Sequence, residues 1–143
     1  MQIRPFRMDD EAAVVALWEQ CGLTRPWNDP HKDVSRKLKV QPELFLVGEE
    51  DAAIVATVMA GYEGHRGWIN YLAVAPAFRG RGFARALIGR VEKVLLGMGC
   101  PKISLLIRSS NPEAMAFYRH IGYAQDDVVT FGKRLIHDRP VGA

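Results

Sequence analysis

The stretch FRGRGFA, residues 78–84, places the small residues Gly80, Gly82 and Ala84 among arginines. An apolar, β-branched segment, 68–74, precedes it, and a run with apolar residues at helical spacing, 83–98, follows it. A strand that enters a helix through a glycine-rich turn directs several backbone N–H groups to one point, beside the positive end of the helix dipole. The stretch therefore predicts a loop that binds an anion such as phosphate.

Two familiar phosphate loops do not fit this stretch. A dinucleotide-binding fingerprint needs a third glycine where Arg85 stands, and a P-loop needs Gly-Lys followed by Ser or Thr. Arg79, Arg81 and Arg85 add positive charge around the turn. A basic surface turn that binds nothing is the alternative interpretation of the stretch taken alone.

The rest of the chain alternates between strand-like and helix-like patterns. The expected strands cover residues 3–6, 44–50, 53–63, 68–74 and 102–107, with two more around Tyr123 and over 128–135. The expected helices cover 13–21, 34–40, 83–98 and a segment that begins at Asn111-Pro112 and ends at Gly122. The strand-helix-strand order over 68–107 implies a parallel pair inside a mixed sheet.

Length and composition limit the class of protein. A chain of 143 residues with 48% hydrophobic and 24% charged residues fits one globular domain, residues 1–143. A net charge of +3 is too small to indicate a nucleic-acid binder, and Cys21 and Cys100 form no zinc or disulfide pattern. No run reaches the roughly 18 apolar residues of a membrane span. We expect a cytoplasmic protein that binds no nucleic acid, membrane or metal.

Two motifs together resemble the GNAT family of N-acetyltransferases. The family's acetyl-CoA loop, Arg/Gln-x-x-Gly-x-Gly/Ala, is matched by Arg79, Gly82 and Ala84, and NPEAMAFYRHIGY, residues 111–123, is similar to its second motif. The resemblance implies the GNAT fold, a mixed α/β (α+β) domain. Its central, mostly antiparallel sheet has six or seven strands, and about four helices pack around that sheet. In that fold a splayed parallel strand pair forms the cofactor slot.

The same resemblance implies an activity. An amine acceptor, either a small molecule or a peptide amine, would attack the acetyl group of acetyl-CoA directly. The alternative is a non-catalytic acetyl-CoA-binding module that regulates a partner. The sequence is also compatible with a homodimer.

Carried over residue by residue, the resemblance implies three kinds of contact with acetyl-CoA. Backbone N–H groups of 80–85 would hold the pyrophosphate, residues 72–74 would lie along the pantetheine arm, and Asn111 would hydrogen-bond the pantetheine. Tyr118 would lie near the sulfur, where a phenol with a pKa of about 10 can protonate the departing thiolate. The implied cofactor-binding residues are Leu72, Ala73, Val74, Arg79, Gly80, Arg81, Gly82, Phe83, Ala84, Arg85, Asn111 and Tyr118.

The sequence has no residue that matches the general base of the most similar subgroup. In the ribosomal-protein N-terminal acetylase subgroup a glutamate precedes the asparagine by five positions, and this chain has Leu106 there. Glu63, at the end of an expected strand, is our predicted catalytic base, with Glu49 or a water-mediated route as alternatives. An acidic residue at a strand end is also typical of a solvated turn. Trp27 and Asn28 are expected to border the acceptor pocket, although Trp27 equally fits core packing.

Overall fold

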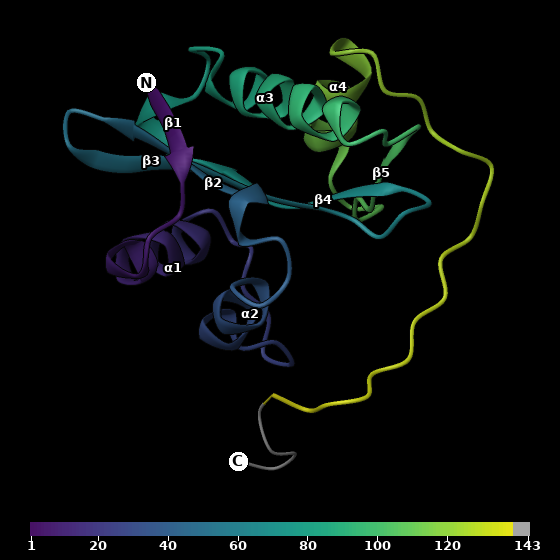
Figure 1. The fold of residues 1–143 in the computed structure, drawn as a ribbon, viewed down its shortest axis with the longest axis horizontal. Helices are drawn as coiled ribbons and strands as arrows, with labels where there is room; N and C mark the ends of the chain where they lie inside the picture. Colours follow the sequence, from purple (N-terminus) through teal and green to yellow (C-terminus); the bar gives the residue numbers. More distant parts are fainter. Residues whose placement is uncertain (139–143) are drawn as a thin grey trace.

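A sheet of five strands lies between two layers of helices in the computed structural model, which describes residues 1–138 (Figure 1). The strand order is β1-β2-β3-β4-β5, with antiparallel pairing from β1 to β4 and a parallel pair between β4 and β5. The strands are β1 (Gln2–Pro5), β2 (Phe45–Glu50), β3 (Ala53–Tyr62), β4 (Gly67–Val74) and β5 (Ile103–Leu105). This mixed, mostly antiparallel sheet confirms the predicted fold class.

Helices cover both faces of the sheet (Figure 1). On one face lie α1 (Glu11–Gln20) and α2 (Pro30–Lys37), and on the other lie α3 (Phe83–Gly97) and α4 (Pro112–His120). Three short 3-10 turns connect the elements: η1 (Met8–Asp10), η2 (Pro42–Leu44) and η3 (Pro76–Phe78).

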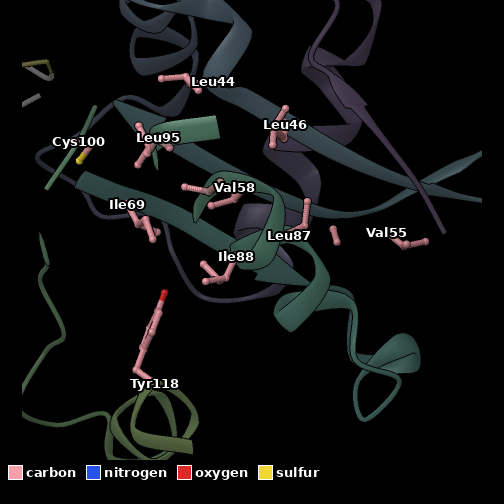
Figure 2. Packing of buried hydrophobic residues seen from close by; sticks show 13 residues of the cluster. Leu44, Leu46, Val55, Val58, Ile69, Leu87, Ile88, Leu95, Cys100 and Tyr118 are labelled. Atoms are coloured by element: carbon pink, nitrogen blue, oxygen red, sulfur yellow. The ribbon is translucent and has the colours of Figure 1, made fainter. Parts of the chain in front are cut away.

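Each helix layer buries its own apolar cluster against the sheet. Val14 and Trp18 of α1 pack with Phe45 and Val47 of β2. On the other face, the apolar stripe of α3 packs against β3 and β4, and Tyr118 of α4 reaches the same cluster (Figure 2). The stripe consists of Leu87, Ile88, Val91 and Leu95. The helical spacing seen in the sequence is therefore the buried face of α3.

The parallel strands β4 and β5 separate after a short paired stretch. Gly67 lies opposite Ile103 and Ile69 opposite Leu105, and this is where their pairing ends. β4 then continues to Val74 beside β3, whereas the chain that leaves β5 turns away from the sheet. The predicted splayed pair is confirmed, and β5 is shorter than the expected 102–107 because its partner diverges.

Two sequence predictions of secondary structure are wrong. The strands expected around Tyr123 and over 128–135 do not form, so the described chain has five strands instead of six or seven. Their residues favour extended backbone, but a strand also needs a partner, and this segment runs away from β5 toward α2 (Figure 1). Phe131, for example, is 91% exposed.

The second error concerns α2, which was expected over 34–40 and spans Pro30–Lys37. Asp29 is its N-cap and accepts a hydrogen bond from the His31 N–H at 2.9 Å, with Pro30 in the first turn. An N-cap aspartate followed by proline is a standard helix start, but here it lies among turn-forming residues, and the sequence was therefore interpreted as a loop.

Candidate active site

The loop between β4 and α3 offers free backbone donors. Gly80 and Gly82 have φ angles of +79° and +80°, and Gly82 is the N-cap of α3. The Ala86 N–H donates to the Gly82 carbonyl at 3.0 Å, so the N–H groups of residues 83–85 precede the first bond inside the helix. A Cβ on either glycine would meet no atom within 4 Å. The left-handed backbone, and not lack of space, is what requires glycine here.

The arginines of the loop differ in their positions. The Arg79 side chain is held by two contacts: its Nε donates to the Val74 carbonyl at 3.1 Å, and its Nη2 lies 3.6 Å from the Cys21 sulfur. The Arg81 guanidinium lies over the Phe78 ring, 5.0 Å from its centroid. Their charges surround the loop, which suits an anion.

One cavity of about 1360 Å³ runs from this loop along β4 to the N-terminal helices. It is larger than the about 300–1,000 Å³ of most small-molecule pockets. The predicted cofactor-binding residues that line it are Leu72, Ala73, Val74, Arg79, Gly80, Gly82, Phe83, Ala84, Arg85, Asn111 and Tyr118. Arg81 is outside this lining. The structure thus gathers nearly the whole predicted set around one space.

Tyr118 lies at the wall of this cavity with a protonated phenol. Its side chain is 8% exposed, and Figure 2 shows its hydroxyl directed from α4 toward the sheet. Burial raises the pKa of Tyr118 to about 12, so the group keeps its proton at neutral pH. Within residues 1–138 the phenol forms no hydrogen bond, which leaves its proton available to a molecule in the cavity. Asn111 caps α4 as predicted, and its Oδ1 accepts from the Ala114 N–H at 3.1 Å.

A bulge in β4 shapes the middle of the cavity. Asn70 pairs with Met59 and Ala73 with Thr57, so β4 carries one extra residue between these pairs. Tyr71, inside the bulge, has a φ angle of +51°. The bulge directs the Tyr71 side chain toward α1 and α2 on the far face of the sheet from α4, which a regular strand would not do at this position.

A buried hydroxyl holds this bulge. Thr57 Oγ1 donates to the Tyr71 carbonyl at 2.9 Å and accepts from the Trp18 indole N–H at 2.9 Å. The Trp18 ring also stacks on the Tyr71 ring with centroids 3.8 Å apart. Thr57 and Trp18 are both fully buried, so this network is sealed from water.

A polar cluster lies at the end of the cavity away from the loop. Asp33 Oδ2 accepts hydrogen bonds from the Tyr71 hydroxyl at 2.6 Å and from Asn28 Nδ2 at 2.5 Å, and Oδ1 accepts from Arg36 Nη1 at 3.1 Å. Burial, and then the hydrogen bond to Asp33, raise the pKa of Tyr71. Sequence reasoning placed Asn28 here but missed Asp33 and Tyr71. Trp27 is outside the cavity lining and is 47% exposed, so it is not a core residue.

The structure does not bring Glu63 to the cavity. Its carboxylate caps the turn between β3 and β4, accepting from the backbone N–H groups of His65 and Arg66 and from Trp68 Nε1 at 2.8 Å. The hydrogen bond from the Arg66 N–H is the main reason that the pKa of Glu63 is lowered. Glu49, the other carboxylate considered, binds Arg4 at 2.9 Å. The role of Glu63 as a base stays a prediction.

The two cysteines have different surroundings. Cys21 is half-buried, lines the cavity and donates to the Val74 carbonyl at 3.4 Å. Cys100 is 7% exposed and belongs to the core beneath α3.

In the described residues no group of three or more His, Cys, Asp or Glu side chains is placed to hold a metal ion. Within residues 1–138 there is also no helix with the length and apolar composition to cross a membrane.

Comparison with known proteins identifies the class. The model of the Acetyltransferase (GNAT) family matches residues 11–123, and the chain belongs to this family. An acetyltransferase of Pectobacterium atrosepticum is 55% identical over 139 residues, which cover 97% of this chain and 99% of that protein. One of Yersinia enterocolitica is 52% identical with the same coverage.

Solved structures show the same fold. Ard1 from Thermoplasma volcanium has a TM-score of 0.75 at 24% identity and covers 86% of this chain and 82% of its own. AAC(6')-Iy in complex with the bisubstrate analogue CoA-S-monomethyl-acetylneamine has a TM-score of 0.75 at 20% identity, with coverages of 93% and 97%. The predicted family and fold are therefore confirmed.

Proposed function

We propose that this chain transfers the acetyl group of acetyl-CoA to the nitrogen of an amine. The observation that carries the proposal is the single cavity that joins the free N–H groups of the β4–α3 loop, the gap between β4 and β5, and the Tyr118 phenol. The relative solved with a bisubstrate analogue of CoA and acetylneamine supports a family architecture that holds both substrates at once.

The residues present fit acetyl-CoA. The N–H groups of 83–85, with Arg79 and Arg85 beside them, suit the pyrophosphate. The apolar residues 72–74 suit the pantetheine arm, and Asn111 keeps an amide N–H₂ for it because only its Oδ1 is used in the helix cap.

The chemistry is a direct displacement. A neutral amine attacks the thioester carbon, an N–C bond forms, and the C–S bond breaks as the thiolate leaves. Tyr118 donates its proton to that thiolate and is later reprotonated from solvent. The proton released by the amine needs an acceptor. Glu63 remains our predicted base, although its place in the turn requires a water-mediated path to the cavity.

An acetyltransferase explains the site better than a regulatory binding module does. A module that only bound acetyl-CoA would need neither the second half of the cavity nor a proton donor at its wall. A cytoplasmic location and a homodimer stay predictions.

Tyr118→Phe tests the proposal. The change deletes one oxygen and keeps the ring, so we expect turnover to fall by about 100-fold or more, the scale of general-acid catalysis, while acetyl-CoA still binds. Thiol release from acetyl-CoA gives the rate and calorimetry gives the affinity. Near-normal turnover in the variant would remove the general-acid role, and a wild-type protein that failed to bind acetyl-CoA would refute the proposed function itself.

A further inference from the structure

We propose that the segment 124–138 is a strap that holds the end of the cavity away from the loop, and that Asp138 is the positioning residue through which it acts. The inference goes beyond the proposed function, since it concerns how this part of the cavity wall is held and not which molecule binds there. It starts from the path of the segment, which leaves the neighbourhood of β5 and crosses to α2 on the other face of the sheet (Figure 1).

The strap is held by polar contacts and not by packing along its length. Its apolar side chains Val129, Phe131 and Leu135 are 83%, 91% and 85% exposed. In the part of the chain that the structure describes, its backbone forms no hydrogen bond with another backbone group. A second cavity, of about 690 Å³, lies between Trp27 and residues 132–136. Apolar burial therefore contributes little to the position of the strap.

Asp138 makes the most buried of the polar contacts. Its side chain is fully buried, and Oδ2 accepts from the Asp29 N–H at 2.8 Å and from Arg36 Nη1 at 3.1 Å. Arg36 Nη2 donates to Oδ1, and Lys32 Nζ donates to the Asp138 carbonyl at 3.1 Å. The hydrogen bonds from Arg36 are the main reason that the pKa of Asp138 is lowered. Because breaking a buried charge-assisted contact is strongly destabilising, Asp138 fixes the strap to α2.

Two links lead from the strap to residues that line the main cavity. Arg36 Nη1 donates to Asp33 Oδ1 at 3.1 Å as well as to Asp138, so one guanidinium joins the strap to Asp33. Arg134 Nη1 donates to Asn28 Oδ1 at 3.3 Å. Asp33, Asn28 and Arg36 line the cavity, and both strap residues are outside that lining. The strap therefore acts on the cavity through other side chains.

The same network continues into the bulge of β4. Asp33 Oδ2 accepts from the Tyr71 hydroxyl at 2.6 Å, and the Tyr71 ring stacks on Trp18. Asp138 and Asp33 share Arg36, so removing the charge of Asp138 leaves the guanidinium to Asp33 alone. Asp33 then moves with Arg36, and the Tyr71 ring follows its hydroxyl. The hold of the strap thus extends to the strand that we assign to the pantetheine arm.

The three tryptophans of the chain report on this network without an added label. Trp18 stacks in the bulge, Trp27 borders the second cavity beside the strap, and Trp68 lies at the start of β4. Their indole N–H signals are recorded by heteronuclear NMR in the wild type and in Asp138→Asn, which keeps the size of the side chain and removes its charge. We expect the Trp27 and Trp18 signals to shift by more than a linewidth and the Trp68 signal to stay in place.

Asp126→Asn is the matched control, because it makes the same change near the other end of the strap. Asp126 pairs with Lys102 at 3.0 Å, and both side chains are about half exposed, so this ion pair contributes little. The control should keep the wild-type Trp18 signal. An unchanged Trp18 signal in folded Asp138→Asn, or an equal shift in the control, would overturn the inference.

A second variant covers the case in which Asp138→Asn does not fold. Arg134 is exposed, and Arg134→Gln removes the charge at the second link, so it should also shift the Trp18 signal. In that case an unchanged Trp18 signal in Arg134→Gln would refute the strap. Calorimetry of the wild-type protein with acetyl-CoA tests the proposed function separately, so the two failures are distinguishable.

Discussion

Replacing Thr57 by valine removes one buried hydroxyl and keeps the shape of the side chain. The hydroxyl joins two groups: it accepts from the Trp18 indole and donates to the Tyr71 carbonyl, both at 2.9 Å. In the variant the Trp18 N–H becomes a buried donor without a partner, because Trp18 is fully buried. An unsatisfied buried donor costs about 1–3 kcal/mol, and the lost bond to Tyr71 adds about 1 kcal/mol. We therefore expect Thr57→Val to lower the free energy of unfolding by about 2–4 kcal/mol.

Thr57→Ser is the matched control. It keeps the hydroxyl and removes one methyl group, which costs about 1 kcal/mol of burial. Urea unfolding followed by circular dichroism measures both variants, and an unchanged m-value shows that only stability has changed. If the valine variant is as stable as the serine variant, the hydroxyl does not hold the bulge.

Three further outcomes are expected. Gly82→Val should weaken acetyl-CoA binding in calorimetry, because a β-branched residue at a φ of +80° is strained by about 1–2 kcal/mol and displaces the loop N–H groups; Gly89→Ala in α3 is the control that should keep the affinity. The hydrogen bonds from Arg4 lower the pKa of Asp10, so its contribution to stability is present above the unfolded value of about 3.9 and is lost as the pH falls through the folded pKa. Unfolding curves of Asp10→Asn should accordingly depend less on pH below about 4 than those of the wild type, and an equal acid dependence would contradict this coupling. Glu63→Gln should lower the acetylation rate at neutral pH with acetyl-CoA affinity intact; a wild-type rate would transfer the role to water or to the substrate.

Local patterns in the sequence were enough for most of the fold. The apolar stripe of α3, the cap at Asn111 and the glycines of the loop each act within a few neighbouring residues, so periodicity and capping rules find them. The prediction of the C-terminal strands was wrong because strand formation depends on distant residues. Val128 and Phe131 have the residue types of a strand, but strand formation depends on whether a sheet edge is within reach, which no local pattern records.

The candidate site divides in the same way. Residues assigned to acetyl-CoA lie in three short segments, 72–74, 79–85 and 111–118, and nearly all of them line the cavity. The polar cluster at the other end combines Asn28 and Asp33, which are near each other in sequence, with the distant Tyr71, and they meet because a bulge turns Tyr71 toward α2. The positive φ of a tyrosine has no signature in the sequence, since such backbone is expected of glycine or asparagine.

The two cysteines give the protein a built-in labelling position. Cys21 lines the cavity beside Arg79, whereas Cys100 is buried in the core. A thiol-reactive fluorophore should therefore modify Cys21 first, at the mouth of the loop that we assign to the pyrophosphate. Acetyl-CoA in the cavity should slow that labelling, and the reaction rate would report ligand occupancy on unaltered protein, before any acceptor is known.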